Sequence, residues 1–462
     1  SDDTIIFEDP LDCLELLEII QQHPGLVRAE WPEGERYKIR QQAGFAHLSI
    51  SLKEKDHWFQ CTGELKADEA TVLALKELLD TTRTVKKRFV ALQNGEFLAL
   101  TGELRKRLNE MSGIARMDRG TVKIAPFAAP VLDELLEQAG SVVTDAAWKA
   151  FSRKRAAAMA LEEPVPVTLQ TTLRPYQEEG FRWLTHLAAW GAGACLADDM
   201  GLGKTIQAIA LLLHRAQSGA ALVICPASVV TNWSNEINRC APSLNVVYLH
   251  NGNRAALIKG AGPFDVVITT YGLLQAEEEL LSAVKWPTIV LDEAHTIKNF
   301  QTKTSRAAMS LQAGFKLMLT GTPIQNHMGE IWNLFNFLNP GLLGTLDHFN
   351  KQFVFPSVRN PESTVKQHLR KLIAPFILRR TKTGVLDELP PKTEIVKLVS
   401  LSPDEAAFYE ALRKCASFKF NNNTFPNRNN SDYFIMVRPS ASAMPRGISS
   451  AEGDFAQSVG TE

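Results

Sequence analysis

The chain has 462 residues, 45% hydrophobic and 22% charged, with a formal net charge of -1 at pH 7. This length predicts two to four domains of ordinary globular composition, and so small a net charge excludes a global field that would attract nucleic acid. No apolar run reaches the ~18 residues of a membrane span, so we expect no membrane partner and a cytoplasmic location.

Residues 1–165 predict an α+β domain. Short β-rich runs predict strands at 37–40, 46–52 and 57–65, and a strand pair over 88–100 around Asn94-Gly95. Apolar residues recur at helical spacing over 68–82 and 131–139. No catalytic constellation is found in this region, and EEPVPV (162–167) predicts an extended linker after it.

The pattern changes over residues 166–400. Apolar, β-rich runs lie at 221–225, 246–249, 265–269, 287–291 and 315–319. Buried parallel strands have this composition, and their alternation with helices predicts a doubly wound, mainly parallel α/β sheet. A helical insertion is expected around 328–375. The segment from residue 421 has an Asn cluster and no sustained periodicity, which predicts disorder.

An apolar stretch, a Gly-rich turn and a helix meet at DDMGLGKT, which comprises Asp198, Asp199, Met200, Gly201, Leu202, Gly203, Lys204 and Thr205. Gly201 and Gly203 let the backbone curl around phosphate, and the helix N-terminus adds partial positive charge. We expect Lys204 to reach the β- and γ-phosphates of ATP and Thr205 to bind Mg²⁺. The general phosphate-loop pattern has glycine where Asp198 stands. The alternative is a structural turn with a chance Lys-Thr pair.

The run IVLDEAH (289–295) places an acidic pair after a predicted strand. Asp292 should lie at the carboxyl edge of the sheet, where ligands bind, and hold Mg²⁺ through water. Glu293 would orient and deprotonate the attacking water, and His295 would face the γ-phosphate or a neighbouring motif. Such a pair is often only a helix cap. Its place 88 residues after Lys204 within one alternating pattern favours catalysis.

Six segments in order resemble the motifs of the Swi/Snf family of helicase superfamily two. They are LRPYQEEGFRWL (173–184), LADDMGLGKT (196–205), ICPASVVTNWSNEI (224–237), ITTYGLL (268–274), VLDEAHTIKN (290–299) and LTGTPIQN (319–326). FILRRTK (376–382) and LPPKTE (389–394) resemble the family's segment leading out of its first lobe. The resemblance implies a RecA-like, ATP- and Mg²⁺-binding lobe. Residues 1–165 resemble, more loosely, the accessory domain of bacterial members, which implies a nucleoid-associated protein of the bacterial cytoplasm.

The resemblance also implies roles for single residues. Gln177 would read adenine beside Arg174, and Asp199 stands where the family usually has glutamate. Coupling of nucleotide state to DNA contact is implied for Thr320, Gly321 and Thr322. Contact with the DNA backbone is implied for Pro226, Ser228, Trp233, Thr269, Thr270, Tyr271, Lys298, Arg379 and Arg380. Core packing is the stronger interpretation of Trp183, Trp233 and Trp332, and Thr269 and Thr270 have the alternative of plain strand-end residues.

Residues 366–382 form a basic run with six Lys or Arg and no acid. One interpretation is a phosphate-contacting or lobe-joining surface, and the other is a solvated face with internal ion pairs. The LRR element within the run favours the first.

The family's motor has two RecA-like lobes, and similarity here fades after residue 414. We expect residues 401–420 to begin the connection to a second lobe and 421–462 to be disordered or non-native. An arginine finger contributes about 10³–10⁵ in rate in related chemistry, so the chain is expected to bind Mg-ATP but hydrolyse it poorly alone.

Three functional hypotheses stay open. The first is a double-strand DNA translocase that displaces RNA polymerase or other DNA-bound proteins. The second is a hydrolysis-deficient fragment that binds nucleotide and DNA, and the third is an RNA helicase. TTYGLL, HTIKN and LRRTK favour the Swi/Snf branch.

Overall fold

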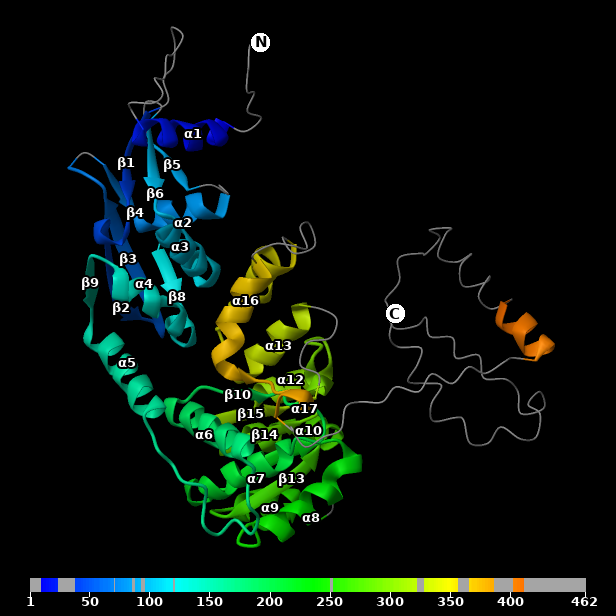
Figure 1. Cartoon of the computed structure of the whole chain (residues 1–462). Coiled ribbons are helices and arrows are strands. Elements are labelled where there is room, and N and C mark those ends of the chain that lie inside the picture. The colour runs from blue at the N-terminus through cyan, green and yellow to red at the C-terminus, as the bar shows by residue number, and fades with distance from the viewer. Residues whose placement is uncertain are drawn as a thin grey trace. The chain divides into compact units, whose positions relative to one another are not determined.

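The structure is a computed structural model that describes residues 10–23, 38–69, 71–84, 88–92, 96–118, 121–249, 252–321, 328–355, 365–385 and 402–410. Contacts divide the chain into two compact units, 1–389 and 390–462, whose elements are drawn in Figure 1. The Asn94-Gly95 turn, Thr322 and the tail from residue 421 lie outside the described residues. None of the described helices is long and apolar enough to cross a bilayer.

The first 165 residues form the predicted mixture of helices and strands. The helices are α1 (Pro10–Gln22), α2 (Leu75–Thr84), α3 (Gly102–Ile114), α4 (Asp133–Gln138) and α5 (Ala146–Met159). The strands are β1 (Lys38–Ala43), β2 (Leu48–Lys55), β3 (Trp58–Lys66), β4 (Val72–Ala74), β5 (Phe89–Ala91), β6 (Glu96–Leu100), β7 (Arg116–Asp118), β8 (Thr121–Ile124) and β9 (Ser141–Thr144). They form two sheets, in the orders β1-β6-β5 and β7-β8-β3-β2-β9, with β4 on β3. Antiparallel pairing of β5 with β6 confirms the strand pair expected over 88–100.

The prediction of one helix over residues 68–82 is wrong in its first half. Val72–Ala74 form strand β4, and the helix begins only at Leu75. β4 pairs antiparallel with β3, with Leu73 opposite Leu65, so its backbone groups find partners in a sheet. The β-branched Val72 favours extended backbone, and this preference combines with the pairing to outweigh the helical spacing.

A seven-stranded sheet forms the core of the second region, and all its pairings are parallel. Its order is β12-β13-β11-β14-β15-β10-β16. The strands are β10 (Ala194–Leu196), β11 (Ala221–Cys225), β12 (Asn245–Tyr248), β13 (Asp265–Thr270), β14 (Lys285–Asp292), β15 (Gln312–Leu319) and β16 (Ile377–Leu378). The five predicted strand runs fall in β11 to β15. The α/β fold class with a doubly wound, mainly parallel sheet is confirmed.

The helices of this region form two groups. They are α6 (Pro175–Trp190), α7 (Lys204–His214), α8 (Val230–Cys240), α9 (Arg254–Gly260), α10 (Tyr271–Ala276), α11 (Glu278–Ser282), α12 (Lys303–Ser310), α13 (Met328–Leu338), α14 (Leu346–Phe349), α16 (Val365–Ile373) and α17 (Lys382–Val385). α7 contacts α6 and α8, whereas α12 contacts α10, α11 and α13, which is the arrangement of a doubly wound sheet (Figure 1). α13, α14 and α16 account for the helical insertion expected around 328–375.

The N-terminal region packs directly against the parallel-sheet region. Trp190 of α6 stacks on Phe376 with ring centroids 5.6 Å apart, and Phe127 meets Trp190 edge-on at 5.6 Å. Lys371 of α16 pairs with Glu110 of α3 at 2.5 Å. The two regions therefore share one apolar core within the unit 1–389. Residues 161–166 between them form neither helix nor strand and Val167 lies in a turn, so the extended linker expected over 162–167 stays a prediction. The domain boundary at 165 stays a prediction.

We expect the stability of the folded chain to depend on pH because of Lys316 on β15. Burial lowers the pKa of Lys316 from 10.5 to about 8, and its Nζ lies 4.5 Å from the centroid of the Phe337 ring. The folded state therefore penalises the ammonium below about pH 8, and the penalty fades as the pH rises toward 10.5. We expect Lys316→Met to raise the free energy of unfolding at pH 7 by about 1–2 kcal/mol, because the ring contact offsets part of the burial.

Urea unfolding at pH 7 and about pH 9.5 checks this expectation. The parent chain should gain stability between the two pH values relative to the Lys316→Met variant. A variant that is less stable at pH 7, or the same pH response in both proteins, would contradict it.

Candidate nucleotide-binding site

The predicted phosphate loop and the predicted acidic site lie at one edge of the parallel sheet. Leu196, the last residue of β10, and Asp292, the last residue of β14, both align with Leu319 of β15 between them. Two interstrand spacings separate the ends of β10 and β14, roughly 10 Å. The loop that follows Leu196 and the carboxylate of Asp292 therefore flank the carboxyl end of β15, where open α/β sheets bind ligands.

Two glycines give the loop its curl. Gly201 and Gly203 have φ of +87° and +73°, in the left-handed region that other residues rarely adopt. Gly203 directly precedes α7, and a Cβ there would lie 2.5 Å from Nε2 of Gln177. The loop needs glycine at this position both for its backbone conformation and for the close approach of Gln177.

Lys204 points back into the loop. Its Nζ donates to the carbonyl oxygens of Asp198 at 2.7 Å and Asp199 at 3.3 Å. Burial lowers the pKa of Lys204, and the nearby carboxylates, with Asp198 first and then Glu293 and Asp292, oppose that shift. The ammonium thus lies within the electrostatic reach of both the loop and the acidic site, as the predicted phosphate contact requires.

Asp292 is held by donors from two other elements. Its Oδ2 accepts from Nε1 of Trp233 at 2.8 Å, its Oδ1 accepts from the backbone N–H of Glu293 at 2.9 Å, and its carbonyl oxygen accepts from Tyr271 Oη at 2.7 Å. Burial raises the pKa of Asp292, whereas the Trp233 bond lowers it. These contacts fix the carboxylate in one orientation.

Trp233 and Tyr271 therefore take places that differ from the predicted DNA contacts. Trp233 is 1% exposed and Tyr271 is buried, and both bond to Asp292. A side chain enclosed in this way cannot lie on a DNA backbone. Core packing, the alternative interpretation of Trp233, is correct. The hydrogen bond from Trp233 to Asp292 was not predicted from the sequence.

Glu293 adopts an unusual backbone conformation for a residue other than glycine. Its φ of +49° and ψ of +53° lie in the left-handed region. Such strain persists when the surroundings impose it, and it clusters at functional sites. His295 Nδ1 lies 3.2 Å from Oε2 of Glu293, so the histidine contacts the expected water-activating carboxylate.

The predicted coupling segment contacts the phosphate loop. Thr320 is buried, and its backbone N–H donates to the carbonyl oxygen of Leu196 at 3.1 Å. A Cβ on Gly321 would lie 3.0 Å from Cγ of Met200, so this glycine packs on the loop. Thr320 and Gly321 therefore lie between the phosphate loop and Asp292. A conformational change in the loop could reach the acidic site through them, and the reverse.

Gln177 lies beside the loop but is already engaged. Its Oε1 accepts from the backbone N–H of Arg174 at 2.9 Å, and its Nε2 donates to the carbonyl oxygen of Leu202 at 3.2 Å. A bond from the Gln177 amide to adenine would require exchange of one of these partners. The role of Gln177 and Arg174 at the base stays a prediction.

The remaining predicted DNA contacts differ in accessibility. Ser228 and Arg379 are exposed, and Lys298 is 44% exposed at the side chain while paired with Glu330 at 3.1 Å. Pro226 is half-buried, Thr269 is buried, and the Thr270 side chain accepts from the N–H of Leu273 as the cap of α10. Ser228, Lys298 and Arg379 are thus the members of the set that are open to a ligand, and Thr269 fits the alternative of a strand-end residue.

Arg380 is not a surface residue. Its Nη2 lies 2.5 Å from Oδ2 of Asp198, its Nε donates to Oδ1 at 3.1 Å, and Nη1 donates to the carbonyl oxygen of Tyr176. The side chain of Asp198 is 0% exposed and that of Arg380 is 12% exposed. The prediction that Arg380 binds DNA is contradicted, because the guanidinium donates its hydrogen bonds to acceptors inside the lobe.

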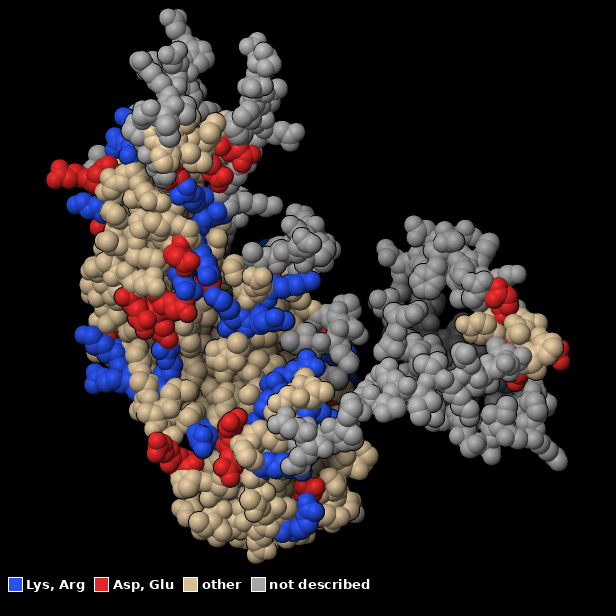
Figure 2. Space-filling view, viewed as in Figure 1, with Lys and Arg blue, Asp and Glu red and all other residues tan. Residues whose placement is uncertain are grey.

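The basic run 366–382 therefore does not form one surface. Lys371 pairs with Glu110 and Arg380 with Asp198, while Lys366, Arg370, Arg379 and Lys382 are exposed. Lys and Arg side chains gather around α16 and again near α17 in the space-filling view (Figure 2). The ion pairs of Lys371 and Arg380 fit the interpretation of internal ion pairs, and a phosphate-contacting or lobe-joining surface stays a prediction for the exposed members of the run.

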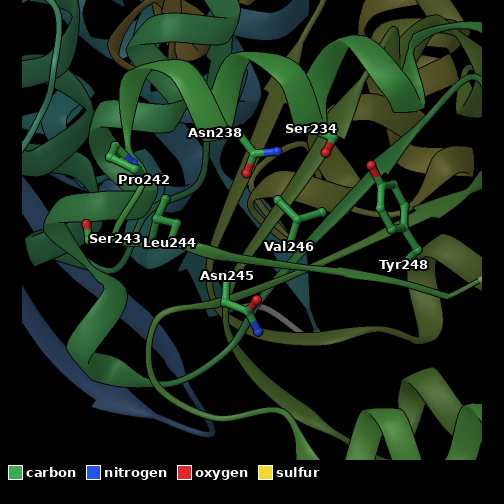
Figure 3. Close-up of a pocket in the computed structure, with 8 residues that line it drawn as sticks. All are labelled: Ser234, Asn238, Pro242, Ser243, Leu244, Asn245, Val246 and Tyr248. Carbon is green, nitrogen blue, oxygen red and sulfur yellow. The ribbon is translucent and has the colours of Figure 1, made fainter.

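A separate hollow of about 440 Å³ lies between α8 and β12 (Figure 3). Its lining residues are Ser234, Asn238, Pro242, Ser243, Leu244, Asn245, Val246 and Tyr248. None of these belongs to the phosphate loop or the acidic site. The hollow is wide open and bordered by the edge strand of the sheet, so we do not assign it to the nucleotide.

Comparison with known proteins gives consistent matches. The SNF2-related domain family matches residues 176–441. YwqA of Bacillus subtilis (strain 168), named as a candidate ATP-dependent helicase/translocase, is 41% identical over 342 residues, which cover 71% of this chain and 36% of YwqA. The chromatin-remodeling ATPase INO80 of Arabidopsis thaliana is 39% identical over 277 residues, which cover 54% of this chain and 18% of INO80. The chain thus spans about a third or less of these relatives.

A solved structure is also similar. The SWI2/SNF2 ATPase core of Sulfolobus solfataricus in complex with dsDNA is 38% identical over 57% of each chain, with a TM-score of 0.46.

Proposed function

The chain belongs to the SNF2-related domain family and contains a Swi2/Snf2-type ATPase domain, and from this premise we propose that it is the ATP-binding lobe of a double-strand DNA-dependent ATPase. In this proposal the complete motor translocates on duplex DNA and remodels protein–DNA complexes. The observation that carries it is the alignment of the ends of β10 and β14 on either side of Leu319. That alignment puts Lys204 and Asp292 within electrostatic reach of one another.

The described residues fit Mg-ATP chemistry. Mg²⁺ prefers one or two protein oxygens plus substrate phosphates, and no cluster of three or more His, Cys, Asp or Glu in the described part of the chain offers a dedicated metal cage. Thr205 and Asp292 would hold the ion, which supplies charge neutralisation on the β- and γ-phosphates when bound. Lys204 would bind the same phosphates, and the loop N–H groups would cradle them.

Glu293 would act on the attacking water. Its carboxylate would accept a hydrogen bond from the water, orient it in line with the γ-phosphate and take up its proton. The contact with His295 at 3.2 Å would limit the rotation of that carboxylate.

Duplex DNA is the proposed partner, by analogy with relatives that are named as chromatin-remodeling ATPases. Ser228, Lys298 and Arg379 are the exposed candidates for backbone contacts, which would be independent of sequence. The similarity to a Bacillus subtilis protein favours a bacterial cytoplasm. Displacement of RNA polymerase or another DNA-bound protein, and association with the nucleoid, stay hypotheses that derive from the family resemblance.

We also propose that this 462-residue polypeptide turns ATP over slowly by itself, because its described residues contain one RecA-like lobe and the family's motor places ATP between two. Binding of a fluorescent ATP analogue with Mg²⁺ should be readily measured and should weaken at least about tenfold in Lys204→Ala, which loses a charge-assisted phosphate contact. Duplex DNA should bind with an affinity that falls steeply with salt. Equal nucleotide binding by the parent chain and Lys204→Ala would overturn the proposed site. Rapid steady turnover stimulated by duplex DNA would overturn the slow-turnover proposal alone.

A further inference from the structure

The segment Leu378–Lys382, here called the strap, runs alongside the first half of the phosphate loop. Ala197 N–H donates to the carbonyl oxygen of Leu378 at 2.7 Å, and Asp199 N–H donates to that of Arg380 at 3.0 Å. In return, the N–H of Lys382 donates to Oδ2 of Asp199 at 3.2 Å. The strap thus continues the parallel pairing of β16 with β10 beyond the end of the strand and into the loop.

Arg380 fixes the register of the strap. Its backbone N–H and its Nε both donate to Oδ1 of Asp198, at 3.0 and 3.1 Å, and its Nη2 reaches Oδ2 of Asp198 and, at 2.8 Å, Oε1 of Gln207. A bidentate arginine–carboxylate pair of this kind restricts both partners in distance and in orientation. The residue two positions after Arg380 is therefore held at a defined place over the loop.

Lys382 occupies that place. A Cβ on Gly201 would lie 3.4 Å from Cε and 3.5 Å from Nζ of Lys382, so the ammonium lies over the α-carbon of Gly201. Lys382 is exposed, and no carboxylate within the described ranges forms an ion pair with it. Lys and Arg side chains are also prominent near α17, which Lys382 begins (Figure 2). An ammonium group is thus held over the turn of the loop. It forms no ion pair with a described carboxylate, although the Asp199 carboxylate accepts from the backbone N–H of Lys382.

The strap lies on the side of the loop away from the acidic site. It hydrogen-bonds Asp198 and Asp199 beyond the end of β10, on the side of β16. Asp292 ends β14, which lies beyond β15 on the other side of β10. Lys204, the residue expected to reach the β- and γ-phosphates, lies against the carbonyl oxygens of the same two loop residues. A phosphate group held by the loop would therefore meet Lys382 on its β16 side.

We propose that Lys382 is a second phosphate-binding lysine of the nucleotide site, which contacts the phosphates of a nucleotide bound at the loop, and that Arg380 is its positioning residue. The proposal rests on the proposed function and adds to it a contact from the segment that leads out of the lobe. Since the strap follows β16 at the edge of the sheet, nucleotide binding at the loop would also hold the start of the chain that continues beyond it.

The test compares Lys382→Ala with Lys259→Ala in the full 462-residue chain, using ATP and ADP with Mg²⁺ as probes. Lys259 is an exposed lysine of α9, which follows the opposite edge strand of the sheet, so its loss changes the net charge equally. We expect Lys382→Ala to weaken the binding of both ATP and ADP about tenfold, and Lys259→Ala to change neither. Lys382→Arg should restore most of the ATP affinity.

Two further variants separate the possible failures. Lys204→Ala should weaken both nucleotides, and if it does not, the proposed function itself fails. If Lys204→Ala weakens binding and Lys382→Ala leaves the affinity for both nucleotides unchanged, the proposal for Lys382 is overturned. Arg380→Lys, which keeps the charge but not the planar fork of donors, should weaken the binding of both nucleotides while circular dichroism stays that of the parent chain, and should weaken it little further when Lys382 is already alanine. Equal losses in the parent chain and in the Lys382→Ala variant would overturn the positioning role.

Discussion

Replacing Asp292 by asparagine is expected to lower the Mg²⁺-dependent part of nucleotide affinity about 10- to 100-fold, the usual cost of losing a group that holds a metal through water. The indole N–H of Trp233 and the backbone N–H of Glu293 donate to the two carboxylate oxygens, so the carboxylate has one orientation in the folded chain. Asparagine keeps the size of the side chain but removes its charge. Titration of ADP with and without Mg²⁺, followed by thermal shift, measures the difference between the two affinities.

Two variants show whether the loss belongs to the metal site. Trp233→Phe removes one donor to Asp292 and should cost Mg²⁺-dependent affinity less than Asp292→Asn, because the charge remains. Asp265→Asn changes an aspartate at the start of β13, the strand end away from the loop, and should leave the Mg²⁺ effect unchanged. A Mg²⁺ effect that survives Asp292→Asn would remove Asp292 from the site.

Strand positions in the parallel sheet could be predicted because the sequence pattern that marks each strand lies within the strand itself. Burial on both faces requires a nearly continuous apolar run, as in Ala221–Cys225, where every residue is buried. The phosphate loop was equally accessible to prediction, since Gly201 and Gly203 are needed for backbone conformation. Parallel strands that end in Leu196 and Asp292 then share an edge whatever their order in the sheet.

The partners of buried polar side chains could not be predicted in this way. Trp233 and Asp292 are 59 residues apart, and Arg380 and Asp198 are 182 residues apart, and no periodicity indicates such pairs. An exposed basic run and one that contains a buried arginine have the same composition. The family resemblance pointed to Arg380 as important but could not tell a DNA contact from an internal ion pair.

The departure from the general phosphate-loop pattern now has a physical reason. Asp198 stands at the position of a glycine, fully buried, and its carboxylate accepts from Arg380 and Gln207. The hydrogen-bonded group of Asp198, Arg380 and Gln207 fits because residue 180 is glycine. A Cβ at residue 180 would collide with Oε1 of Gln207 and lie 2.8 Å from Nη2 of Arg380. A glycine inside a helix costs roughly 0.5–1 kcal/mol relative to alanine, and here it makes room for the ion pair.

Removing one partner of that pair should have the largest effect on stability. We expect Arg380→Ala to lower the free energy of unfolding by about 3–5 kcal/mol, because the Asp198 carboxylate would remain buried without its cation. Asp198→Asn should cost less, since Arg380 keeps the carbonyl of Tyr176 and the amide of Gln207 as acceptors. Urea unfolding at neutral pH measures both losses.

The double variant Asp198→Asn/Arg380→Ala decides whether the loss belongs to the pair. It should be less destabilised than the sum of the two single variants by about 1–3 kcal/mol, because neither residue then leaves a buried charge unpaired. Lys351→Ala breaks the exposed pair with Asp347 and should cost less than about 1 kcal/mol. Strict additivity of the Asp198 and Arg380 losses would mean that the two side chains do not depend on one another, and the strap would then lack the anchor that holds it against the loop.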